Sequence, residues 1–179
     1  MSELFRIEQR DPETFRRQTR RSTLIVVVLF ALLGMALPAL LIGLFGSADG
    51  SNFGLNLTGV LLAAAITATL VRTVFLKQSW MDAAAYGWRL KRALMRVTNQ
   101  MHQVKDAVKA GDEQAMLLLR FYHLGLQQMH HLDGNTSDML ELVAEREALR
   151  GELAARGLPE EPLSLQSEWL DALKPAAKG

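Results

Sequence analysis

The feature that most constrains how this chain folds is a run of 23 residues, from Thr23 to Phe45, without one charged side chain. As a helix this run would extend about 34 Å, enough to cross a hydrocarbon core of about 30 Å. A buried helix of a soluble protein would show a polar stripe, and this run shows none. A secretory signal peptide would have an apolar core of only roughly 7–15 residues. The run therefore predicts a membrane span over residues 23–45.

A second, weaker span is predicted over residues 57–76. Alanine and threonine dilute its hydrophobicity, and Arg72 lies near its end, where an arginine side chain can reach the lipid headgroups. The connecting residues 46–56 are rich in glycine, serine and asparagine, which is typical of a turn. We therefore expect a transmembrane hairpin over residues 23–76, and we expect Asn56 to cap its second helix.

Arginine and lysine are distributed unevenly around the two predicted spans. Residues 1–22 contain six arginines, the loop contains no basic residue, and five basic residues follow between Lys77 and Arg96. The positive-inside rule then places both termini in the cytoplasm. Four of these arginines stand next to the first span: Arg16, Arg17, Arg20 and Arg21. They suit anionic lipid, at about 1 kcal/mol each near the surface, although topology alone would require the same positive charge.

Small residues recur at a spacing of four on one face of the second span, at Gly59, Ala63 and Thr67. In lipid, close approach of two backbones through small residues is what holds helices together. We expect this face to pack within the hairpin and to meet Gly34 and Gly43 of the first span. The same stripe would also serve an oligomer contact or a pore lining, so these interpretations stay open.

After the second span the apolar residues follow a heptad pattern over residues 80–108, which predicts one helix of about 30 residues ending at Gly111. Asp112 is expected to cap a second helix, and Ser137 to begin a third that ends at Gly157. Short loops place consecutive helices antiparallel, and no strand pattern is visible. The predicted fold is an all-α membrane protein, with a transmembrane helical hairpin followed by a cytoplasmic antiparallel three-helix bundle that has coiled-coil-like seams.

These predictions divide the chain into four segments. Residues 1–22 form a basic N-terminal segment with a short helix, which Asp11 and Pro12 begin. Residues 23–76 form the two-span hairpin and residues 77–157 the cytoplasmic bundle. Residues 158–179 form a short amphipathic tail.

Composition and spacing argue against most kinds of chemistry. The chain has no cysteine, which excludes a thiolate nucleophile, a disulfide and a cysteine-ligated metal. Its net charge of +1 argues against a strongly basic nucleic-acid binder. No two of its histidines have the spacing of three or four that a helical metal pair needs, so we expect them to be solvated or hydrogen-bonded: they are His102, His123, His130 and His131. Since no phosphate loop or catalytic signature is visible, we expect no enzyme and no catalytic, cofactor or metal site.

Several short motifs resemble a family of uncharacterised two-span inner-membrane proteins from proteobacteria, known only as a domain of unknown function. The motifs are Asn52 to Val60, Trp88 to Lys91, Gly111-Asp112, Phe121-Tyr122 and Leu132 to Thr136. The resemblance covers residues 11–160 and leaves residues 161–179 outside it. It implies a bacterial inner-membrane setting and supplies no activity.

The function that we expect is that of a non-enzymatic, membrane-anchored helical module. Its cytoplasmic bundle would bind a protein partner or a second copy of the chain, and its hairpin would contact the lipid bilayer. The alternative is a small oligomeric pore or channel subunit, because two spans alone cannot enclose a conduit. A pore requires a polar stripe on the spans, and threonines supply part of one: Thr58, Thr67, Thr69 and Thr73.

Overall fold

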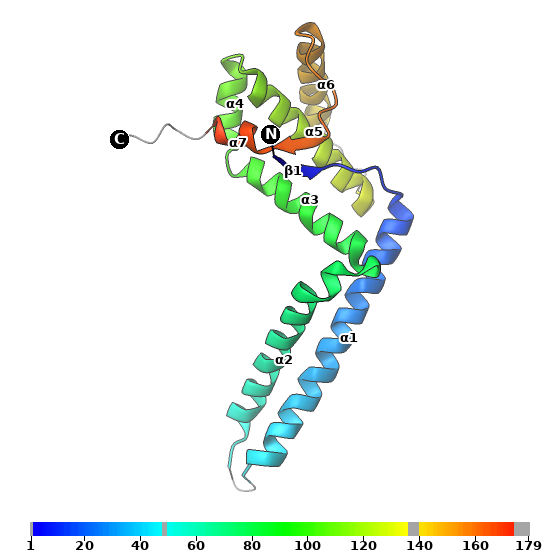
Figure 1. Ribbon diagram of the computed structural model, residues 1–179, viewed down its shortest axis with the longest axis vertical. Helices are drawn as coiled ribbons and strands as arrows, with labels where there is room; N and C mark the ends of the chain where they lie inside the picture. The colour runs from blue at the N-terminus through cyan, green and yellow to red at the C-terminus, as the bar shows by residue number, and fades with distance from the viewer. Residues whose placement is uncertain (1, 48–49, 136–139, 174–179) are drawn as a thin grey trace, which may run out of the picture. The chain divides into compact units, whose positions relative to one another are not determined.

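The computed structural model describes residues 2–47, 50–135 and 140–173. Within them the chain is mostly helical, with seven α-helices and one two-stranded sheet (Figure 1). It divides into two compact units. One comprises residues 16–85, which we call the hairpin unit, and the other comprises residues 1–15 and 86–179, which we call the mixed unit.

The hairpin unit contains two long apolar helices packed side by side, α1 (Pro12–Phe45) and α2 (Phe53–Thr73) (Figure 1). Asp11 caps α1 as predicted, because its Oδ2 accepts a hydrogen bond of 2.8 Å from the Thr14 amide. The helix that Asp11 begins and the predicted first span are one helix of 34 residues. Two short 3₁₀ turns follow α2, η1 (Phe75–Lys77) and η2 (Ser79–Met81).

The prediction that Asn56 caps the second apolar helix is wrong. Helix α2 begins at Phe53, and the Asn56 amide already donates to the carbonyl oxygen of Asn52 at 3.0 Å. The side chain of Asn52 reaches across the loop instead, where its Oδ1 accepts from the Ser47 amide at 3.1 Å and its Nδ2 donates to the Ser47 carbonyl at 3.3 Å. Asn52 therefore closes the loop and does not cap the helix.

The predicted single helix of about 30 residues is also wrong, because the chain forms α3 (Asp82–Thr98) and then α4 (Met101–Lys109). At the break, the Gln100 amide donates to the Val97 carbonyl, three residues back, which tightens the turn. The apolar spacing continues through the break in the same register, so periodicity could not reveal it. Five of the predicted seam positions are buried: Ala83, Leu90, Leu94, Val97 and Val104.

Helix α5 (Glu113–Asp133) is the central element of the mixed unit, and it contacts α4, α6 (Leu140–Ala155), α7 (Ser167–Asp171) and a short strand. The Asp112 cap is confirmed, since its Oδ1 accepts from the Ala115 amide at 2.7 Å. Gly134 ends α5 with a φ of 74°, a conformation that favours glycine. The predicted start of the next helix, Ser137, lies outside the described residues.

The described chain is not wholly helical, because the two ends of the mixed unit form an antiparallel sheet. Strand β1 (Glu3–Arg6) pairs with β2 (Ser164–Gln166), and Phe5 lies opposite Leu165. Leu165 is fully buried in the same core as Phe121 of α5. Strands of three and four residues are too short to leave an alternating pattern, so no pattern in the sequence indicated them.

Candidate functional site

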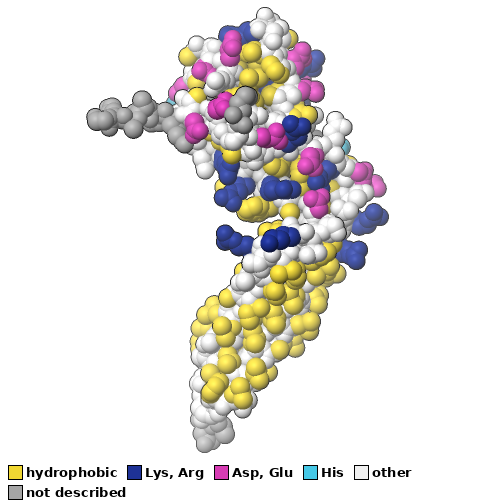
Figure 2. Space-filling view, in the orientation of Figure 1, with side chains coloured by type: hydrophobic (Ala, Val, Ile, Leu, Met, Phe, Trp, Pro, Cys, Tyr) yellow, Lys and Arg dark blue, Asp and Glu magenta, His cyan; other side chains and the backbone are white. Residues whose placement is uncertain are grey.

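The outer surface of the hairpin is apolar. Its large side chains point outward, with exposed fractions of 74% for Met35, 62% for Leu32 and 61% for Leu61. Figure 2 shows hydrophobic side chains covering the visible face of the hairpin. Of the most apolar 18 residues of α1, only 6% are buried inside the structure. For the second apolar helix the share is 17%. Both helices are long and apolar enough to cross a membrane, and neither is the buried core helix of this chain.

The inside of the hairpin holds the small residues that the sequence singled out. Gly59, Ala63 and Thr67 are the buried positions of α2. A Cβ atom built on Gly59 would lie 2.5 Å from the backbone nitrogen of Pro38, so only a hydrogen atom fits there. The partner of this face is therefore Pro38. The predicted partners Gly34 and Gly43 do not touch it, because a Cβ on either would meet nothing within 4 Å.

The threonines of α2 do not present a continuous row of free hydroxyl groups. Thr69 and Thr73 donate to carbonyl oxygens of their own helix, four residues back, at 2.8 and 2.7 Å. Thr67 faces the inside of the hairpin, where its hydroxyl has no hydrogen-bond partner among the described residues.

Basic residues of the hairpin unit lie away from its loop. Residues 16–85 contain six lysines and arginines against two aspartates, a net charge of +4, whereas the rest of the chain carries fourteen against seventeen, a net charge of −3. Arg17, Arg20 and Arg21 on α1 are exposed, and Arg16 is half-buried. Arg72 and Lys77 stand at the other end of the apolar sequence, in the last turn of α2 and in η1.

The histidines lie in different surroundings. His102 is exposed and its Nδ1 lies 2.9 Å from an Asp106 oxygen. His123 is only 2% exposed and its Nδ1 has no partner among the described residues, so this side chain is buried and not solvated. Burial, with a smaller contribution from the cationic Arg120, lowers the pKa of His123 to about 4. In the part of the chain that is described, no group of three or more histidines and acids could hold a metal ion.

Arg120 is a buried residue that sequence reasoning missed. It is 5% exposed, its Nε donates to the Glu160 carbonyl at 2.7 Å, and its Nη1 donates to the Arg146 carbonyl at 3.3 Å. Burial lowers the pKa of its guanidinium. It thus holds the segment around Glu160 against α5. Arg120 is the one charged residue between Met116 and Tyr122, and this isolated charge in an apolar stretch could have indicated it.

These features define a mostly helical protein with two membrane-length apolar helices packed as a hairpin. The chain belongs to a protein family of unknown function, DUF3087, whose family model matches residues 5–170. The match confirms the resemblance to a domain of unknown function, and it includes residues 161–170, which the resemblance had left outside. No curated protein matches the chain, and no solved structure does.

Proposed function

We propose that this protein is a membrane-anchored helical module of the bacterial inner membrane. Its hairpin spans the bilayer with both termini in the cytoplasm, and its mixed unit binds a protein partner or a second copy of the chain. The observation that carries the proposal is the arrangement of residues in the hairpin. Small residues such as Gly59 lie inside it, and large apolar residues such as Met35 lie on its outer surface.

Water is an unfavourable surrounding for the outer surface of the hairpin. Leaving a leucine or methionine side chain in water rather than in an apolar phase costs roughly 1.5–3 kcal/mol. More than a dozen large apolar side chains of α1 and α2 are exposed. A hydrocarbon environment removes this cost.

The distribution of charge supports the orientation. The described part of the loop, residues 46, 47 and 50–52, carries no charge, while the exposed arginines Arg17, Arg20 and Arg21 stand on the first helix before its apolar run. Under the positive-inside rule this end faces the cytoplasm, and the same arginines would meet anionic headgroups there. In the mixed unit the exposed large apolar side chains include Met95, at 62%, and Leu163, at 41%, and these are candidates for a contact with a partner.

Membrane fractionation of the full chain tests the anchor. We expect the protein to stay with the membrane in alkaline carbonate and to leave it only in detergent. The double variant Leu32→Arg with Leu61→Arg places charge in both spans, at roughly 2.5–3.5 kcal/mol each, and should appear in the soluble or aggregated fraction. Phe45→Arg, at the loop end of α1, is the matched control and should stay in the membrane. Extraction of the unaltered protein by carbonate alone would contradict the proposal.

Partner binding is tested by co-expressing two differently tagged copies and purifying one tag from detergent extract. We expect either the second copy or one protein in stoichiometric amount to be recovered, and a strictly monomeric, partner-free preparation would contradict this part of the proposal. The pore alternative has weaker support, because three of the four threonines of α2 are engaged or turned inward: Thr69 and Thr73 bond to their own helix, and Thr67 lies inside the hairpin.

A further inference from the structure

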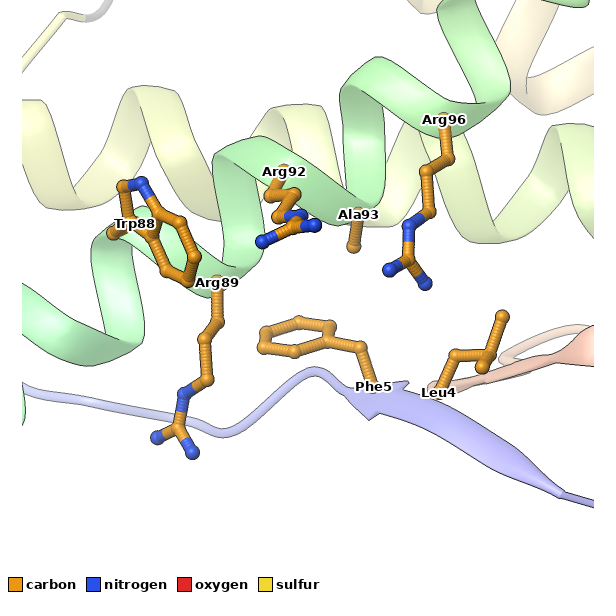
Figure 3. A pocket seen from close by; sticks show the side chains of 7 residues that line it. All are labelled: Leu4, Phe5, Trp88, Arg89, Arg92, Ala93 and Arg96. Carbon is orange, nitrogen blue, oxygen red and sulfur yellow. The ribbon is translucent and has the colours of Figure 1, made fainter. Parts of the chain in front are cut away.

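A cavity of about 230 Å³ lies between strand β1 and helix α3 of the mixed unit (Figure 3). Leu4 and Phe5 of β1 and Trp88 of α3 form its apolar wall. The basic side chains that line it are Arg89, Arg92 and Arg96 of α3. Its volume corresponds to about eight molecules of liquid water, so it suits a small group and not a drug-sized ligand.

The three arginines form an unbalanced positive cluster. Their spacing of three and four residues places them on one face of α3, where like charges repel one another. No carboxylate in the described chain forms an ion pair with any of them. Lys91 on the same helix differs, because its Nζ lies 3.5 Å from an Asp133 oxygen. The cluster is therefore available to an anion from outside the chain.

The acids that stand nearest in β1 and just after it are engaged elsewhere. Glu3 binds the Arg6 guanidinium at 3.1 Å, and Glu8 binds that of Arg10 at 2.6 Å. No acidic residue lines the cavity. Its electrostatic potential is consequently positive, and an anion that enters meets no carboxylate at its wall.

The guanidinium groups and the apolar wall face one another. In Figure 3, Arg92 and Arg96 extend from α3 towards β1, on the side where Phe5 lies. The guanidinium carbon of Arg92 lies 5.1 Å from the centre of the Trp88 ring, a contact that orients it. Trp88 is itself 56% exposed, so most of its ring remains open to a ligand. The cavity thus offers planar cationic donors beside an apolar surface.

We propose that this cavity binds a phosphate ester that carries a short apolar chain. Arg92 and Arg96 donate to the phosphate oxygens, Arg89 adds charge, and the chain lies against Phe5 and Trp88. A guanidinium group binds phosphate through two parallel hydrogen bonds. The three guanidinium groups together offer more donors than the two oxygens of one carboxylate would accept, which favours a phosphate. A lipid headgroup and a soluble phosphate monoester share this chemistry. The site does not depend on the membrane anchor proposed above.

Calorimetric titration of the full chain in the uncharged detergent dodecyl maltoside tests the site. The probes are inorganic phosphate, hexyl phosphate and dihexanoyl phosphatidylglycerol. We expect hexyl phosphate to bind more tightly than inorganic phosphate because of its chain. If the lipid binds more tightly than hexyl phosphate, the natural ligand is a headgroup, and the reverse order identifies a soluble monoester. If no probe binds, the proposal is overturned, and the fractionation result for the anchor is unaffected.

Variants separate this site from general charge effects. Arg92→Gln with Arg96→Gln should weaken binding of hexyl phosphate at least about tenfold, because charge-assisted hydrogen bonds are lost. Lys105→Gln with Lys109→Gln removes the same charge from α4 and should leave affinity within about twofold. Trp88→Ala should weaken hexyl phosphate more than inorganic phosphate, because it removes the apolar wall as well as the ring that orients Arg92. Circular dichroism checks that each variant is folded, and Arg92→Lys with Arg96→Lys should bind with intermediate affinity. Equal affinity for the Arg→Gln pair and the parent would overturn the proposal.

Discussion

The phenol oxygen of Tyr86 lies 3.0 Å from the backbone nitrogen of Glu8 and 3.2 Å from its carbonyl oxygen, so one side chain satisfies both backbone groups of a residue 78 positions away. The Tyr86 ring is fully buried, 5.6 Å from the ring of Phe5 and 6.4 Å from that of Phe15. The Arg10 guanidinium covers it at 4.2 Å. Within the mixed unit, this residue fastens the N-terminal segment to α3.

Replacing Tyr86 with phenylalanine should therefore loosen the N-terminal segment. The change keeps the ring and leaves the Glu8 amide without this partner, which costs about 1–3 kcal/mol. We expect faster hydrogen exchange of residues 3–10 and a lower unfolding temperature. Tyr122→Phe is the control, since Tyr122 is half-buried and its hydroxyl makes no hydrogen bond within the described chain. Similar exchange in the two variants would show that the hydroxyl of Tyr86 does not fasten this segment.

The close contact between Gly59 and Pro38 predicts that a Gly→Ala change destabilises the hairpin at position 59 and does not do so at other positions. Gly59→Ala places a Cβ within 2.5 Å of the Pro38 nitrogen and should destabilise the hairpin by about 1–3 kcal/mol. Gly54→Ala and Gly34→Ala meet nothing within 4 Å, and the helical preference of alanine should make them neutral or stabilising. Thermal unfolding in detergent, followed by circular dichroism, measures all three. A Gly59→Ala protein as stable as the Gly34→Ala protein would contradict the packing of this face.

Acidification should destabilise the mixed unit through His123. Its pKa is about 4 in the folded chain against an ordinary value of 6.5, so the unfolded chain binds the proton more readily between these pH values. Above about pH 6.5 the imidazole is neutral in the folded and the unfolded chain, and the free energy of unfolding is highest. As the pH falls to about 4, the unfolded chain takes up the proton, and up to about 3 kcal/mol of that free energy is lost.

The test compares unfolding temperatures at pH 7 and pH 4.5 for the parent and for His123→Leu, which cannot titrate. We expect the drop on acidification to shrink in this variant. His102→Leu removes an exposed histidine beside Asp106 and serves as the control, because it should keep the drop of the parent. If His123→Leu and the parent lose the same number of degrees, His123 is not the group that senses acid.

Sequence patterns predicted those features of the fold that depend on local chemistry. The capping aspartates Asp11 and Asp112 accept from amides three residues on, as their positions predicted, because a cap needs only its own turn. The two apolar helices follow equally from length and hydrophobicity. The same periodicity wrongly predicted one long helix across Asn99 and Gln100. The apolar spacing continues there, although the helical hydrogen-bond pattern is interrupted.

Long-range contacts could not be read from the sequence. The pairing of β1 with β2 joins segments 160 residues apart, and neither strand has enough residues for an alternating pattern. Nothing near Tyr86 in the sequence indicates Glu8 as its partner. For the arginine cavity a signal did exist, because the sequence from Ala83 to Lys105 contains no acidic residue to balance Arg89, Arg92 and Arg96.

The central claim, a hairpin that spans the inner membrane with its loop outside and its mixed unit inside, is tested most directly by cysteine labelling. The chain has no cysteine, so Ser51→Cys in the loop and Ala154→Cys on α6 each introduce a single exposed thiol. A maleimide that cannot cross the inner membrane is added to cells with a permeabilised outer membrane. We predict labelling at position 51 in these cells, and labelling at position 154 only after lysis. Labelling of position 154 before lysis, or protection of position 51, would contradict the account.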